Sequence, residues 1–198
     1  MSIQNIFSLY DDKKPDYLTQ VVIENLLANK ETRNDFKQFL QRYWSQAERS
    51  DSLRKHFLNV VMHFLPEAGG RYPTVIKAIL TDWAQYAAYT LVEWTEIYTA
   101  LETNQPFPPH CNDVSRTIYH MVNRYGWKKY TDGATSYEQG SEMLRNGALI
   151  SCLIWLDYPE YRQDVAMGGA SIQVIFHALT YSVDWKKVAQ ALEVAENP

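Results

Sequence analysis

The stretch TDWAQYAAYTLVEWTEIYTALE, residues 81–102, decides the fold of this chain because its apolar side chains recur with the period of an α-helix. At 100° per residue, apolar side chains fall on one broad stripe, formed by Trp83, Ala87, Leu91, Trp94, Ile97, Tyr98 and Leu101. The stripe continues upstream through Ile76, Ile79 and Leu80. The pattern therefore predicts one long helix over residues 74–103, or two nearly collinear helices, with one face in the core.

A second face of this predicted helix is both aromatic and acidic. Asp82, Tyr86, Tyr89, Glu93 and Glu96 fall together about 120° from the apolar stripe. Tyrosine is enriched at interfaces, because its ring gives a large contact area at low entropic cost. We therefore expect Tyr86, Tyr89, Glu93 and Glu96 to bind a protein partner.

Two alternatives for this face stay open. In the first, the tyrosines pack beneath the N-terminal helices and hydrogen-bond the carboxylates. In the second, the carboxylates hold a metal ion inside a helical bundle. Such sites typically use Glu-x-x-His pairs on two helices, and the sequence contains no Glu-x-x-His.

The rest of the chain repeats the helical period, and the segments between breakers predict helices over 17–29, 31–48, 52–65, 113–125, 137–156, 170–181 and 184–196. Asn112 and Asp184 are expected as N-caps, and Gly126 as a C-terminal stop. The fold class is therefore all-α, a compact multi-helix bundle of about seven to nine helices. We expect a single domain over 1–198, with a crossover linker at 104–112, where NQPFPPHCN breaks the helical pattern.

Composition and charge are those of an ordinary globular protein. The chain is 46% hydrophobic and 21% charged, with a net charge of −4. Residues 1–105 carry 11 basic and 13 acidic side chains, and residues 106–198 carry 8 and 10, so each half is at −2. Neither half is a basic module, and we expect neither nucleic acid nor an anionic membrane as the partner.

The two cysteines indicate a reducing, cytoplasmic setting. Cys111 follows a proline-rich loop, and Cys152 lies in the apolar run GALISCLIWL. The N-terminus lacks a charged region followed by an apolar one, so we expect no signal peptide. The longest apolar run, residues 147–156, is too short to span a bilayer.

No metal, cofactor or catalytic motif is expected from spacing. His56 and His63 are seven residues apart on one helix, too far for joint chelation. His110 and Cys111 are adjacent, which is poor geometry for a tetrahedral ion, and neither CxxC nor HxxxH supports them. His120 is expected at the surface, and His177 is expected in the core. Nucleophile elbows and phosphate-binding glycine loops are absent.

One segment, NRYGWKKYTDG at 123–133, interleaves basic and aromatic side chains. Its candidate contacts for an anion or nucleic acid are Arg124, Trp127, Lys128, Lys129 and Tyr130. An acidic protein partner is an alternative. In a third interpretation the positive charge complements a helix C-terminus, and Trp127 anchors the loop.

These observations favour a cytosolic protein-binding or regulatory protein of inhibitor, immunity or adaptor type, acting through the aromatic and acidic helix face. The alternative is an enzyme or a small-ligand-binding protein with a pocket between helices. Such a pocket would combine distant polar groups, for instance Tyr86 and Glu93 with Arg145 or His177. The sequence determines neither the partner nor the oligomeric state.

Overall fold

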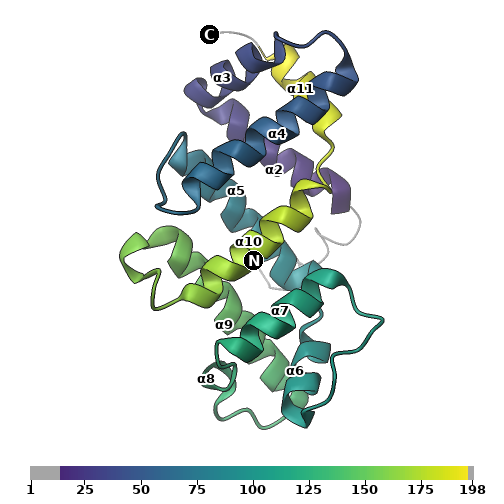
Figure 1. Cartoon of the computed structure of the whole chain (residues 1–198), viewed down its shortest axis with the longest axis vertical. Coiled ribbons are helices and arrows are strands. Elements are labelled where there is room, and N and C mark those ends of the chain that lie inside the picture. The colour runs from purple at the N-terminus through teal and green to yellow at the C-terminus, as the bar shows by residue number, and fades with distance from the viewer. Residues whose placement is uncertain (1–13, 196–198) are drawn as a thin grey trace, which may run out of the picture. The chain divides into compact units, whose positions relative to one another are not determined.

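The computed structural model describes residues 14–195, and every regular element in this range is a helix (Figure 1). The α-helices are α2 (Lys14–Ala28), α3 (Lys30–Leu40), α4 (Gln46–Phe64), α5 (Pro73–Tyr86), α6 (Trp94–Thr103), α7 (Asp113–Arg124), α8 (Lys128–Thr131), α9 (Tyr137–Asp157), α10 (Ala166–Thr180) and α11 (Trp185–Val194). A π-helical turn covers Ala87–Leu91 and a 3₁₀ turn covers Pro159–Tyr161. The all-α prediction is confirmed. The segment that carries the signal-peptide expectation lies outside the described residues.

The described helices fall into two compact units. Residues 14–82 and 179–195 form the first, which contains α2, α3, α4, α11 and most of α5. The second, Trp83–Ala178, contains α6 to α9 and most of α10. Segment 104–112, expected as a crossover, joins α6 to α7 inside the second unit. The single-domain expectation stays a prediction. None of the helices in the described range is long and apolar enough to cross a membrane.

In the first unit, the C-terminal helix α11 packs against α2, α3 and α4. The Trp185 ring lies 5.2 Å from the Phe57 ring, centroid to centroid. Asp184 is the N-cap that the sequence predicted, since its carboxylate accepts two backbone N–H groups from the first turn of α11. Its own N–H donates to Thr19 Oγ1 at 2.9 Å. The start of α11 is thereby attached to α2.

In the second unit, α9 packs against α6 and α8, and α6 packs against α7. Glycines on α9 permit close approach of neighbouring elements. A Cβ at Gly147 would collide with the Tyr130 ring. On α10, a Cβ at Gly168 would collide with the backbone of Ser151 in α9. Gly168 lies inside α10, because this helix begins at Ala166 and not at the predicted residue 170.

Residues 74–103, predicted as one long helix or two nearly collinear helices, form two helices, α5 and α6, with a π-helical turn between them. α5 ends at Tyr86, and the N–H of Val92 donates to the carbonyl of Ala87 at 2.9 Å, five residues back. Val92 itself is extended, with φ −87° and ψ 127°. A single continuous helical wheel across this stretch is therefore wrong, because residues after the break leave the register set before it.

Side chains from the start of α7 stabilise this break. Asn112 Nδ2 donates to the carbonyl of Leu91 at 2.9 Å, and the N–H of Glu93 donates to Ser115 Oγ at 2.9 Å. Asn112 is also the predicted N-cap of α7, since its side chain accepts the N–H of Ser115 at 2.8 Å. Groups about twenty residues away thus satisfy backbone atoms that a continuous helix would have paired locally.

The predicted boundary between helices 31–48 and 52–65 is also wrong. α3 ends at Leu40, and α4 begins at Gln46. Ser45 Oγ accepts the Glu48 N–H, and the Glu48 carboxylate accepts the Ser45 N–H, each at 3.2 Å. This reciprocal pair is a capping box, and it starts α4 at Gln46, six residues before the predicted helix start at residue 52.

Candidate functional site

The tyrosine and carboxylate face predicted from the sequence is largely internal to the second unit. Tyr86 is only 6% exposed. Tyr89 is half-buried, and the Arg145 guanidinium carbon lies 4.7 Å from its ring centroid. Glu93 and Glu96 are half-buried and lie beyond the helix break. The four residues therefore do not form one continuous helix face, and partner binding by them stays a prediction.

Glu93 instead connects α6 to the start of α7. Its Oε2 accepts hydrogen bonds from both the backbone N–H and the Nδ2 of Asn112, each at 2.9 Å. The carboxylate also lies near the thiol of the preceding residue, Cys111, and raises its pKa. These contacts fix the end of segment 104–112 against the first turn of α6.

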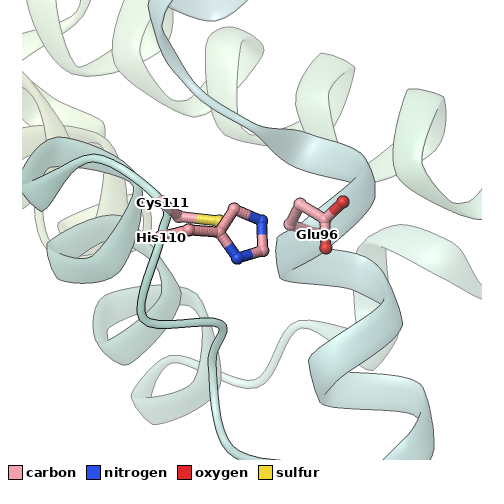
Figure 2. A group of neighbouring side chains, drawn as sticks. All are labelled: Glu96, His110 and Cys111. Atoms are coloured by element: carbon pink, nitrogen blue, oxygen red, sulfur yellow. The ribbon is translucent and has the colours of Figure 1, made fainter.

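Glu96, His110 and Cys111 meet at this junction and form what we call the Glu–His–Cys cluster (Figure 2). One ligand-type atom of each side chain lies within 4.8 Å of those of the other two. Figure 2 shows the side chains of His110 and Cys111 overlapping in this view, with Glu96 of α6 beside the imidazole. Cys111 is buried, Glu96 is half-buried and His110 is exposed, so the cluster is open to solvent on the histidine side.

The irregular backbone of segment 104–112 allows two adjacent side chains to reach the same place. The Cys111 N–H donates to the carbonyl of Pro108 at 3.4 Å, which closes a tight turn. Arg116 of α7 donates to the carbonyl of Pro109 at 3.2 Å. The Phe107 ring stacks on Tyr119 at 5.1 Å between centroids. Because the segment is held along α7, the positions of His110 and Cys111 are set by packing.

Electrostatics at the cluster oppose a thiolate in the absence of a cation. Burial raises the pKa of the Cys111 thiol, and the nearby carboxylates of Glu93 and Glu96 raise it further. Arg116 acts in the opposite direction. The carboxylates of Glu93 and Glu96 therefore affect the thiol more than Arg116 does.

In the basic segment 123–133, the aromatic rings are packed against other side chains. Trp127 is 7% exposed and meets the Tyr98 ring edge-on at 5.7 Å. Lys128 Nζ lies 5.7 Å from the Trp127 ring, and Lys129 Nζ lies 4.9 Å from the half-buried Tyr130 ring. Arg124 and both lysines are exposed. The arrangement leaves the cations accessible but covers the rings that would stack on bases. Anion binding by the segment stays a prediction.

The first unit contains a hollow of about 500 Å³ between α4 and the loop that follows it. Its lining combines imidazole, amide and guanidinium groups with an apolar residue: His56, Asn59, Val60, His63, Gly70 and Arg71. The volume lies within the range of about 300–1,000 Å³ that is usual for small-molecule sites.

Polar contacts orient two of the lining side chains. His56 Nε2 lies 3.2 Å from Asp35 Oδ2, and its ring stacks on Phe39 at 4.2 Å between centroids. Arg71 Nη1 lies 3.5 Å from the other oxygen of Asp35. Pairing with a carboxylate fixes the orientation of an imidazole. The hollow therefore contains a histidine that is held in place and a guanidinium that is 65% exposed.

The loop that closes the hollow has an unusual backbone. Ala68 and Tyr72 adopt positive φ values of 52° and 58°, which non-glycine residues rarely do. Gly70 has φ 77°, and a Cβ there would lie 3.2 Å from the Cβ of His63. The pKa of Tyr72 is raised, chiefly by burial and then by the charge of Asp35. Strained backbone of this kind is often found at functional sites.

Sequence reasoning missed both assemblies. Glu96 lies 14 residues before His110 on a different element, and no metal-binding motif has that spacing. The surface position expected for His120 is confirmed, but His177 is exposed and not in the core. Arg145 lies against the Tyr89 ring, and a site that combines Tyr86 and Glu93 with Arg145 or His177 stays a prediction. A useful signal would have been the pair His110–Cys111 directly before a helix cap, in a segment too rich in proline to be helical.

Comparison with protein-family models, with curated proteins and with solved structures finds no match to this chain.

Proposed function

We propose that this protein is a cytosolic binding protein whose hollow in the first unit takes a small organic anion, a carboxylate or phosphate ester with an apolar body. The observation that carries the proposal is the convergence of Arg71, His56 and His63 on one hollow of about 500 Å³. No carboxylate lines this hollow among the described residues.

Charge and shape support an anion with an apolar part. Arg71 is in a single long ion pair with Asp35, at 3.5 Å, and a guanidinium has five N–H donors. Donors therefore remain for a ligand carboxylate or phosphate, which arginine binds bidentately. Val60, buried in α4, supplies an apolar wall beside the two histidines. A ligand with only one of these features would leave either Arg71 or Val60 without a matching contact.

The test is ligand-observed NMR with benzoate and phenyl phosphate as probes and neutral benzyl alcohol as the comparison. Both anions are expected to bind the natural protein more tightly than benzyl alcohol does. Arg71→Ala should weaken anion binding about tenfold or more, as expected for loss of a hydrogen bond to a charged group. Lys186→Ala removes an exposed cation from α11 in the same unit and should leave binding unchanged.

Two results would contradict this proposal. One is equal binding of the anions to the Arg71→Ala variant and to the natural protein. The other is equal binding of benzyl alcohol and benzoate, which would remove the requirement for charge. In separate protein-observed spectra, chemical-shift changes confined to His56 and His63 would place the probe in the hollow.

A second candidate function is the protein binding expected from the sequence, supported now by a different surface. Trp44 is 95% exposed and Val194 is 80% exposed. Arg49 connects the residues next to both side chains. It donates to the carbonyl of Tyr43, which precedes Trp44, at 2.9 Å, and it forms an ion pair with Glu193, which precedes Val194. Exposed tryptophan is rare on a free surface and common at the centre of interfaces. The test captures a protein partner with the natural protein and with the Trp44→Ala variant. If the variant folds normally but no longer captures the partner, the result supports this surface over the tyrosine face.

A further inference from the structure

We propose that the Glu–His–Cys cluster of the second unit, Glu96, His110 and Cys111, binds a divalent transition-metal ion, and that Zn²⁺ is the ion its donor set fits. The inference is independent of the hollow, which lies in the first unit. It rests on the positions of the three side chains and on the chemistry of their donor atoms.

The distances are close to those of a zinc site. Around tetrahedral Zn²⁺, bonds of about 2.0–2.3 Å place neighbouring ligand atoms roughly 3.3–3.8 Å apart. The donor atoms of the cluster all lie within 4.8 Å of one another. The donor atoms would therefore have to move about 1 Å closer to one another to bind one ion, which is a distance that side-chain rotation covers. Glu96 is half-buried and His110 is exposed, so both have room to rotate toward a buried Cys111.

The donor set selects the class of metal. A thiolate is a soft ligand that Mg²⁺ and Ca²⁺ do not prefer, whereas cysteine, histidine and carboxylate together are typical of Zn²⁺. The ion would also offset the negative charge that the nearby Glu93 carboxylate adds at Cys111. Asn112 holds one oxygen of Glu93 at 2.9 Å, so this carboxylate has a fixed position near the cluster.

The position of the cluster suggests what the ion does. Glu96 comes from the first turn of α6, and the other two ligands come from the last part of segment 104–112. A metal ion would link this segment to α6 and strengthen the contacts that Glu93 and Asn112 already make. Because the cluster has three ligands and His110 is exposed, the fourth position of a tetrahedral ion would be open to water or an exogenous ligand.

The experiment titrates tag-free, metal-stripped protein with Co²⁺ as a spectroscopic substitute and with Zn²⁺ by calorimetry. One equivalent of Co²⁺ is expected to give the intense visible bands of tetrahedral coordination and a thiolate charge-transfer band in the near ultraviolet. Cys111→Ser should abolish the charge-transfer band. His110→Ala and Glu96→Gln should each weaken Zn²⁺ binding by more than the roughly 10–100-fold that loss of an outer-shell partner costs.

Matched controls separate coordination from folding. Cys152→Ser alters the other thiol of the second unit, and His120→Ala removes an exposed histidine from α7; both should bind as the natural protein does. Glu96→Gln keeps the side-chain shape, so it decides the question if Cys111→Ser fails to fold. Absence of stoichiometric binding to the natural protein would overturn the proposal. So would binding that is unchanged in both His110→Ala and Glu96→Gln.

Discussion

Tyr86 and Trp44 are both aromatic residues of the kind that protein interfaces use, but their surroundings give them opposite roles. Tyr86 is 6% exposed, and Trp44 is 95% exposed. A buried ring contributes mainly to the stability of the fold. An exposed ring can contact a partner without being withdrawn from the core, so binding through it does not destabilise the fold. The residue type alone therefore does not identify a binding surface.

Tyr86→Ala is expected to lower the free energy of unfolding by about 3–5 kcal/mol, as truncation of a buried aromatic side chain does. Trp44→Ala should change it by no more than about 0.5 kcal/mol, as for other exposed positions. Thermal denaturation followed by circular dichroism measures both, at about 2–4 °C per kcal/mol for a chain of this size. A Tyr86→Ala protein that melts with the natural one would return the tyrosine face to consideration as a partner surface.

At the scale of elements, the break between α5 and α6 depends on the residue that starts α7. Asn112 caps α7, and its Nδ2 donates both to the Leu91 carbonyl and to the Glu93 carboxylate. A serine at this position would keep the cap but would lack the amide donor. The two functions of one side chain can therefore be separated by substitution.

Asn112→Ala is expected to lower the free energy of unfolding by about 2–3 kcal/mol, from a lost cap of about 1 kcal/mol and two further hydrogen bonds. Asn112→Ser should lose about 1 kcal/mol less, because the cap remains. Urea denaturation of the two variants measures the difference. Equal midpoints for Asn112→Ala and the natural protein would show that the contacts across the break contribute no net stability.

At the scale of the whole molecule, the two thiols report on the integrity of the second unit. Both are free and buried, Cys111 in segment 104–112 and Cys152 in α9. Burial raises the pKa of Cys152 to about 12, so almost none of it is thiolate at neutral pH. Its reactivity therefore depends on opening of the structure.

At pH 8, we expect Cys152 of the native protein to react with a thiol reagent only as fast as the second unit opens. In denaturant, both thiols should react without this delay. Stopped-flow labelling with mass spectrometry assigns the modified residue and also checks that no disulfide joins the two. Rapid labelling of Cys152 in the native state would contradict the burial on which this prediction rests. Added Zn²⁺ should slow labelling of Cys111 alone if the cluster binds it.

The sequence by itself determined the helical class and two of the helix starts. Hydrophobic period, the caps Asn112 and Asp184, and the stop at Gly126 are local features, so they can be read without knowing what lies nearby in space. The capping box at Ser45 and Glu48 was equally local and could have corrected the α3–α4 boundary.

Only the tertiary structure decided where the long helix breaks and which polar groups meet. The break at Val92 is stabilised by Asn112, about twenty residues away, so a helical wheel that assumes continuity places Glu93 and Glu96 incorrectly. The Glu–His–Cys cluster depends on the same junction, since a proline-rich turn brings His110 and Cys111 beside α6. The physical reason is that these contacts join residues distant in the chain, and periodicity and spacing describe only neighbours.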